Sequence, residues 1–183
     1  MRLLAISGSL RAGSSNTTLL EAVRVLAPAG VEIQMYGGLA DLPAFNPDLD
    51  TMEGERLPRI VADLRAEVGR ASGILISSPE YAHGIPGSLK NALDWLVGSV
   101  EFPGKPVALL TPSARSVHAH AQLVEVLTTM NARVIGQASV TTQLPSRTMG
   151  AAAIAADVEL GPLLRSAIHA MTQAIAEPGK SRT

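Results

Sequence analysis

A loop rich in small polar residues follows the first apolar run of the chain. It consists of Gly8-Ser9-Leu10-Arg11-Ala12-Gly13-Ser14-Ser15-Asn16-Thr17 and leads into a helical pattern. Free backbone N–H groups at a helix start, small hydroxyl and amide side chains and the Arg11 guanidinium together suit a phosphate group. Hydrogen bonds to a charged group contribute about 1.5–3 kcal/mol each, so three or four would anchor a phosphate monoester. The alternative is a helix capped by Ser or Asn that binds no ligand.

The spacing within this loop differs from two common nucleotide-binding patterns. Gly8 and Gly13 have the spacing of a triphosphate-binding Walker A loop, but Ser14 stands where that loop requires Lys. Leu10 stands where a dinucleotide fingerprint requires its second Gly, and Glu32 lies at the start of the second expected strand rather than at its end. We therefore expect a ligand with one phosphate.

A second loop, Ser77 to Gly87, is rich in Pro and Gly. These residues fix an unusual backbone in which N–H and C=O groups can face a planar heterocycle, while Tyr81 or Ile85 covers its surface. His83 alone is weak support for catalysis, because a turn histidine more often has a structural or exposed role. Trp95, further along, is expected in the core or in a subunit contact.

A third loop, Thr111 to His118, carries Arg115, which faces either a ligand phosphate or solvent. His118 and His120 are two residues apart and diverge by about 200° on a helix with 3.6 residues per turn. A metal site built on that pair is therefore not expected.

Three unbroken apolar runs precede these loops, at Leu3–Ile6, Gly73–Ile76 and Pro106–Leu110. Such runs are typical of parallel strands that are covered on both faces. Val31–Tyr36, which alternates and so belongs near an edge, and Arg133–Val140 are two further strand candidates.

Helical patterns at about 16–27, 54–70, 86–97 and 118–130 separate these strands. The alternation predicts an α/β fold with a five-stranded, doubly wound parallel sheet, and ligands of such sheets bind at the carboxyl ends of the strands. Residues 150–156 are an Ala-rich linker or helix, and a last helix begins near 160 or at Pro162. The long loop Gly37–Asp50 is expected to be functional.

Length and composition limit the remaining possibilities. At 183 residues the chain corresponds to roughly 1.2 typical domains, so we expect one domain over 1–177 and a flexible tail over 178–183. A net charge of −1 without charged blocks gives no support for nucleic-acid or membrane binding. The absence of Cys excludes thiolate chemistry, so any electron transfer needs an organic cofactor. The short apolar start and the lack of long apolar runs favour a cytoplasmic protein.

Two motifs carry a family resemblance. Gly-Ser-Leu-Arg-x-x-Ser-x-Asn at 8–16 and Ser-Pro-Glu-Tyr-x-His-Gly-Ile-Pro-Gly-x-Leu-Lys-Asn-Ala-Leu-Asp-Trp at 78–95 resemble the NADPH-dependent FMN reductase family, a flavodoxin-like group that includes quinone, azo-dye and chromate reductases. The resemblance covers about residues 1–145 and implies the strand order 2-1-3-4-5. The chain departs from the usual family pattern at Ala82, where Asn is common, and after the fourth strand, where a glycine-rich turn is common.

The resemblance implies an enzyme that binds FMN and uses NADPH or NADH as the hydride donor. Hydride would pass from nicotinamide to FMN N5 and on to a quinone-like acceptor in a ping-pong cycle, with no catalytic side chain and no metal. A homodimer or homotetramer is implied as well. The FMN phosphate would lie against Ser9, Arg11, Ser15 and Asn16, and the flavin ring against Pro79, Glu80, Tyr81, His83 and Gly84. Thr17, Ala82 and Ser113 complete the implied cofactor site.

Two other functions remain open at this point. A non-enzymatic flavodoxin-type electron carrier would use the same phosphate loop, although such carriers are generally strongly acidic. A hydrolase with Ser9 as the nucleophile is a further alternative, but His169 is its only late candidate base and Ser166 lies three residues before it, where an orienting Asp would be needed.

Overall fold

A parallel sheet forms the centre of the molecule, and the computed structural model describes residues 1–50, 56–146 and 148–177. The sheet follows the order β2-β1-β3-β4-β5, with β6 also paired to β4, which confirms the predicted order. The strands are β1 (Arg2–Ser7), β2 (Glu32–Met35), β3 (Gly73–Ser77), β4 (Pro106–Thr111), β5 (Arg133–Val134) and β6 (Val140–Thr141).

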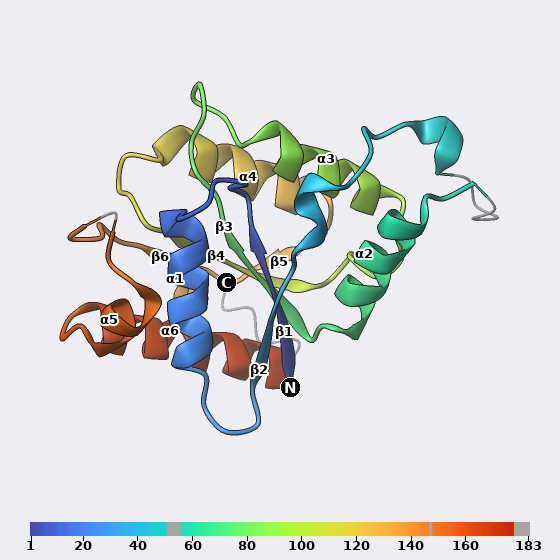
Figure 1. The fold of residues 1–183 in the computed structure, drawn as a ribbon. Helices are drawn as coiled ribbons and strands as arrows, with labels where there is room; N and C mark the ends of the chain where they lie inside the picture. The colour runs from blue at the N-terminus through green and yellow to red at the C-terminus, as the bar shows by residue number, and fades with distance from the viewer. Residues whose placement is uncertain (51–55, 147, 178–183) are drawn as a thin grey trace.

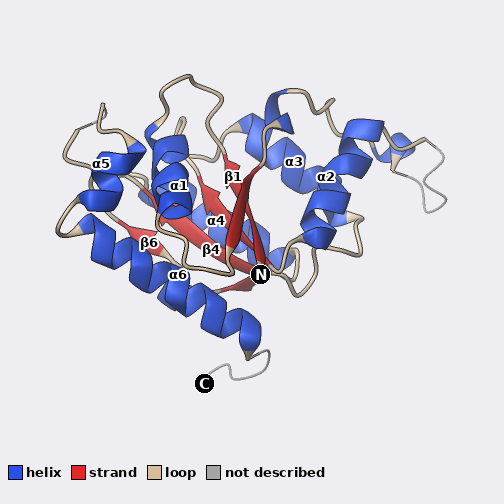
Figure 2. Ribbon diagram, turned by 60° about the horizontal axis from the view of Figure 1, so that its bottom comes forward, coloured by secondary structure: helices blue, strands red, loops and turns tan. Residues whose placement is uncertain are grey.

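Helices cover both faces of this sheet (Figures 1 and 2). One face carries α1, α5 and α6, and the opposite face carries α2, α3 and α4. The helices are α1 (Ser15–Val25), α2 (Arg59–Arg70), α3 (Gly87–Val97), α4 (Val117–Thr129), α5 (Ala151–Ala156) and α6 (Leu160–Ala176). Three short 3-10 turns are η1 (Gly38–Ala40), η2 (Pro47–Leu49) and η3 (Gly136–Ala138).

Successive residues of β1 point into two different cores, because strand side chains alternate between the faces of a sheet. Leu3 and Ala5 pack in the core under α1 and α6, whereas Leu4 and Ile6 pack in the core under α2, α3 and α4. All four are at most 2% exposed. This double burial explains the unbroken apolar run in the sequence.

Trp95 lies in the second of these cores and is fully buried. Its indole N–H donates to the backbone oxygen of Pro43 at 2.8 Å, and its ring meets Phe45 edge-on at a centroid distance of 5.0 Å. Asn91 holds the same loop, because its side chain bonds both Pro43 and Phe45. Asn91 and Trp95 of the second motif thus hold residues 43–45 of the long loop against α3. Lys90 and Asp94, one turn apart on α3, form an ion pair at 2.6 Å.

One expected helix start is wrong, and of the two starts expected for the last helix the earlier one is confirmed. The helix expected over 54–70 begins at Arg59, with Pro58 as its N-cap. A residue before proline is disfavoured in helical conformation, so Pro58 sets the start. The final helix begins at Leu160, ahead of Pro162, after Asp157 accepts N–H groups from Glu159 and Leu160. Residues 54–55 and the expected tail 178–183 lie outside the described residues.

The strand expected over Arg133–Val140 is also wrong, because η3 divides it into the two-residue strands β5 and β6. Ser139 explains how the break is tolerated. Its hydroxyl accepts the backbone N–H of Leu109 in β4 at 3.0 Å and donates to the Ile135 oxygen at 3.0 Å. A side chain thus replaces the strand-to-strand hydrogen bond that the turn removes.

Candidate active site

A pocket of about 600 Å³ opens at the carboxyl ends of β1, β3 and β4. The loops after these strands line it, together with part of the segment that follows β6. Eight of the twelve residues predicted to bind the cofactor line this pocket: Ser9, Arg11, Ser15, Asn16, Pro79, Glu80, Tyr81 and Ser113. Thr17, Ala82, His83 and Gly84 are outside its lining.

The start of α1 presents unpaired backbone donors to the pocket. Ser14 is the N-cap, and its hydroxyl accepts the Asn16 N–H at 3.2 Å. The N–H groups of Ala12, Gly13 and Ser15, which also line the pocket, donate to no group in residues 1–50, 56–146 or 148–177. Gly13 has φ +67°, a left-handed conformation that favours glycine. This end of the pocket therefore suits an anion.

Two guanidinium groups line the same pocket. Arg11 comes from the loop after β1 and Arg115 from the loop after β4, and both are exposed. Neither forms an ion pair with another described residue. Arg115, for which the sequence left two alternatives, lines the pocket and is also exposed to solvent. Both cations are available to a phosphate.

Buried polar contacts hold the phosphate loop on the sheet. The Ser77 hydroxyl at the end of β3 donates to Asn16 Oδ1 at 2.9 Å, and both residues are buried. The Thr17 hydroxyl lies 2.8 Å from the Ser7 hydroxyl. A Cβ on Gly8 would approach Leu89 and Ser78 to 3.0 Å, so glycine there allows the loop to pass close to α3. Thr17 and Gly8 therefore position the loop.

The loop after β3 contains a tight reversal at Tyr81–Gly84. Backbone hydrogen bonds join Tyr81 and Gly84 in both directions at 2.9 Å. Between them, Ala82 and His83 have φ +49° and +59°, both in the left-handed region. The reversal leaves Tyr81, 54% exposed, on the pocket wall and carries the next three residues beyond it.

Glu80 connects this loop to α4. Its Oε2 accepts the backbone N–H of Ala119 at 2.9 Å, while the N-cap residue Ser116 contributes no side-chain bond. A carboxylate at a helix N-terminus is stabilised by the helix dipole. Glu80 thus orders the first turn of α4 and at the same time lines the pocket.

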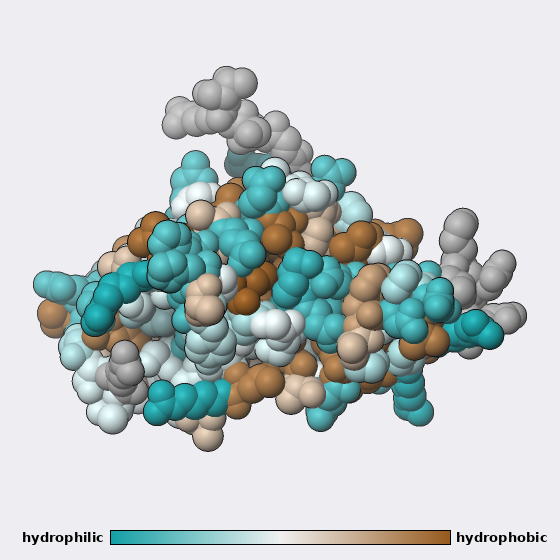
Figure 3. Space-filling model, turned by 90° about the horizontal axis from the view of Figure 1, so that it is seen from above, coloured by the Kyte–Doolittle hydropathy of each residue, from teal (hydrophilic) through white to brown (hydrophobic). Residues whose placement is uncertain are grey.

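The remaining pocket wall was not anticipated. Gln143, Leu144 and Thr148 line it from the segment after β6. No motif marks these residues, which follow β6 in the chain. Conversely, no described residue of the loop 37–50 lines this pocket. Seen from above the molecule, hydrophilic residues are interspersed with smaller hydrophobic areas (Figure 3).

No helix in the described part of the chain is long and apolar enough to cross a bilayer. The pocket lies where ligands of doubly wound sheets bind, at the carboxyl ends of neighbouring strands. Its donors and cations suit an anionic group at one end, and Pro79 and Tyr81 provide apolar surface along the loop after β3.

Comparison with known proteins agrees with this arrangement. The chain is 36% identical over 115 residues to a quinone reductase of Escherichia coli (strain K12), and 36% identical over 116 residues to an NAD(P)H-dependent FMN reductase of Pseudomonas aeruginosa. Each alignment covers 62% of this chain and 60% of the relative, so the chain matches about three fifths of the length of these relatives.

A solved structure is similar over nearly the whole chain. FerB, a flavoenzyme NAD(P)H:(acceptor) oxidoreductase from Paracoccus denitrificans, has a TM-score of 0.83 and 25% sequence identity, and the match covers 96% of this chain and 97% of that one. The family model described as NADPH-dependent FMN reductase matches residues 1–144, which include both sequence motifs and the three strands that carry the pocket. The chain therefore belongs to the NADPH-dependent FMN reductase family.

Proposed function

We propose that this protein is an FMN-dependent NAD(P)H oxidoreductase that passes hydride from the nicotinamide to FMN and on to quinone-like acceptors in a ping-pong cycle. One observation carries the proposal: both family motifs converge on a single pocket whose polar groups fit a flavin mononucleotide. The similar quinone reductase, FMN reductase and flavoenzyme oxidoreductase support the same reaction class.

The groups at the α1 end fit the FMN phosphate. The unpaired N–H groups of Gly13 and Ser15 and the guanidinium of Arg11 are donors without a competing partner in the described chain. Ser9 and Asn16 add polar side chains to the same wall, and Asn16 is held in place through its bond to Ser77. We propose Arg115 as a further phosphate contact.

The loop after β3 fits the ring of the cofactor. Pro79, Glu80 and Tyr81 line the pocket, and Tyr81 offers an exposed aromatic face. Aromatic side chains contact planar rings favourably. Ala82, His83 and Gly84 would act through the reversal that holds Tyr81, and Ser113 would contact the cofactor from the loop after β4.

FMN, when bound, supplies the atoms that accept and return hydride. The chain's own residues then have to bind and orient the cofactor and its substrates and to exclude water. The phosphate loop would hold one end of FMN, and Pro79 and Tyr81 would contact its ring. Holding reactants at about 3–3.5 Å accounts for a large part of the catalysis in such reactions, so rigid walls serve this chemistry.

Two alternatives are less well supported. A flavodoxin-type carrier shares the pocket, but the family match favours a reductase. For a serine hydrolase, Ser9 would need a base, but its hydroxyl forms no hydrogen bond with a histidine of the described chain. It accepts the backbone N–H of Arg11 at 3.4 Å.

We further propose a homodimer or homotetramer that acts in the cytoplasm. Val97 and Val100, near the end of α3, are 64% and 89% exposed and offer apolar surface for a subunit contact. Light scattering on the purified protein measures the subunit number directly, and a monomer at micromolar concentration would contradict this part of the proposal.

The central experiment is a flavin titration followed by reduction. The purified protein is examined for a flavin spectrum, titrated with FMN, and mixed with NADPH without oxygen; bleaching of the flavin and its return on addition of a quinone are expected. Arg11→Ala combined with Ser15→Ala should weaken FMN binding by about 100-fold or more, since charge-assisted hydrogen bonds contribute about 1.5–3 kcal/mol each.

Arg24→Ala is the matched control, because Arg24 is exposed in the last turn of the same helix and is outside the pocket lining. Unchanged FMN affinity in the double variant would contradict the phosphate assignment. Failure of the wild-type protein to oxidise NAD(P)H with FMN bound would contradict the reductase and favour the carrier.

A further inference from the structure

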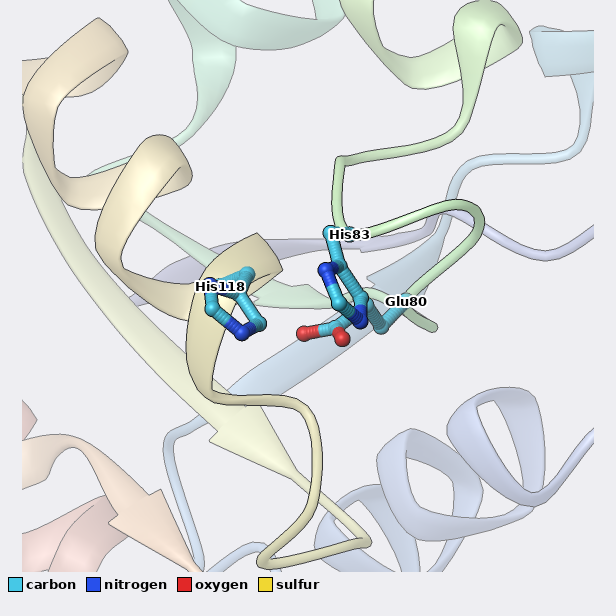
Figure 4. Close-up of side chains that lie close together, drawn as sticks. All are labelled: Glu80, His83 and His118. Carbon is cyan, nitrogen blue, oxygen red and sulfur yellow. The ribbon is translucent and has the colours of Figure 1, made fainter.

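Glu80, His83 and His118 form a cluster beside the pocket (Figure 4). Glu80 and His83 belong to the loop between β3 and α3, and His118 is the second residue of α4. One ligand atom from each residue lies within 4.8 Å of those of the other two. Three metal-ligating side chains from two separate segments thus converge on one point.

Two hydrogen bonds dock the loop on α4 and flank this cluster. Glu80 Oε2 accepts the Ala119 N–H at 2.9 Å, and Gln122 Oε1 accepts the Ile85 N–H at 2.8 Å. The carboxylate is therefore oriented by the backbone, and its second oxygen has no hydrogen bond within the described residues. Such outer contacts are what hold ligands of metal sites in position.

The two histidines face each other across this interface. Their rings are stacked at a centroid distance of 4.2 Å with 17° between the planes. Both side chains are exposed, and their ring nitrogens form no hydrogen bond with any described residue. His120, in contrast, has its Nδ1 3.3 Å from the Thr111 hydroxyl. The nitrogens of His83 and His118 are thus accessible to an ion from solvent.

The sequence argument against a metal site considered the pair His118 and His120, which diverge on their helix, and the family resemblance likewise implied no metal. The structure instead pairs His118 with His83, which lies 35 residues earlier in the chain and has left-handed φ. A left-handed residue directs its side chain differently from an ordinary turn residue, so this pairing has no signature in the local sequence.

We propose that Glu80, His83 and His118 bind a divalent transition-metal ion of the Zn²⁺ class. Two imidazoles and one carboxylate suit Zn²⁺, Co²⁺, Ni²⁺ or Cu²⁺ rather than Mg²⁺ or Ca²⁺, which prefer oxygen ligands throughout. Zinc–nitrogen distances are about 2.0–2.1 Å and imidazole lone pairs lie in the ring plane, so binding requires the two exposed, stacked rings to turn until their nitrogens face one point. The fourth coordination position would hold water. The bound ion would join the loop after β3 to the first turn of α4 beside the pocket.

Calorimetric titration of the purified FMN-free protein with ZnCl₂ at pH 7.5, in a buffer that does not chelate, tests this site. One equivalent should bind. His83→Asn and His118→Ala should each weaken binding at least 10-fold, which is the scale on which loss of a supporting group affects metal sites. Asn is used at 83 because it tolerates left-handed φ.

His169→Ala is the control, since His169 is exposed on α6 and is not part of the cluster. Circular dichroism of each variant verifies that it is folded. Absence of binding up to millimolar Zn²⁺, or equal affinity in the wild type and in the two cluster variants, would overturn the proposal. The readout needs neither FMN nor NADPH, so it is independent of the reductase function.

Discussion

At the scale of single residues, the reversal Tyr81–Gly84 places unusual demands on two side chains. Ala82 and His83 both have positive φ, although neither is Gly or Asn. Left-handed backbone costs about 1–2 kcal/mol for a residue with a Cβ, and Asn bears it more easily. Such strain near a pocket is kept where it positions functional groups. Here it holds Tyr81 on the wall and turns His83 toward α4.

Replacing Ala82 by Asn should therefore raise the free energy of unfolding by about 1 kcal/mol, because the left-handed conformation becomes less costly. Urea denaturation measures the change. Ala114→Asn is the control, since Ala114 is also exposed in a loop but has no positive φ. Equal effects of the two substitutions would show that backbone strain at position 82 is not responsible.

Tyr36, at the end of β2, has a raised pKa. Burial, with a smaller contribution from the carboxylates of Asp41, Asp63 and Glu67, raises the pKa of its phenol to about 12. Its hydroxyl is buried without a hydrogen-bond partner among the described residues. The folded chain therefore keeps this proton at pH values where the unfolded chain, with an ordinary phenol pKa near 10, has lost it.

Stability should consequently decrease as the pH rises from about 10 toward 12, and below pH 10 this group should have no effect, since both states hold the proton. Tyr36→Phe should remove that alkaline decrease. It should also raise the free energy of unfolding at pH 8 by about 1 kcal/mol, because an unpaired buried hydroxyl is removed. Urea unfolding of both proteins at pH 8 and pH 11 measures the two effects, with Tyr81→Phe as the exposed control. A wild-type alkaline slope that persists in Tyr36→Phe would contradict this explanation.

At the scale of elements, the division of the expected strand 133–140 depends on Ser139. Its hydroxyl replaces a backbone partner for the Leu109 N–H, and Leu109 is 1% exposed. Ser139→Ala would leave that N–H unpaired and should lower the free energy of unfolding by about 1–3 kcal/mol. Thermal or urea unfolding measures the loss. Ser146→Ala, in an exposed loop position, should change stability by less than about 0.5 kcal/mol; a similar loss in both variants would contradict the role given to Ser139.

Most of this architecture was predictable from the sequence, and the exceptions have identifiable causes. The apolar runs of β1, β3 and β4 predicted parallel strands correctly, because burial on both faces leaves a strong pattern. The break at η3 was not predictable, since it depends on a contact between Ser139 and another strand. For the same reason, neither the place of Gln143 on the pocket wall nor the approach of His83 to His118 could be predicted from the sequence. Each depends on contacts between segments far apart in the chain.

At the scale of the whole molecule, the proposed phosphate site predicts a link between cofactor and stability. A ligand that binds only the folded chain stabilises it by about 2.7 kcal/mol at a concentration 100 times its dissociation constant. FMN should therefore raise the melting temperature of the wild type, and Arg11→Ala should reduce that rise while leaving the melting temperature without FMN nearly unchanged, because Arg11 forms no ion pair within the described residues.

Riboflavin, which lacks the phosphate, is the ligand control. It should stabilise the wild type and the Arg11 variant equally and less than FMN does. A rise in melting temperature with FMN that is the same in both proteins would mean that the phosphate lies elsewhere in the pocket.

The short strands β5 and β6, which both pair with β4 and are separated by η3, have a consequence for self-association. An outer strand with a continuous row of unpaired N–H and C=O groups is a template on which another chain can add a strand and begin a fibril. Here each piece is two residues long, and η3 turns the backbone between them. This border of the sheet therefore presents no long row for an incoming strand, and the turn between the two strands protects the protein against aggregation from that side.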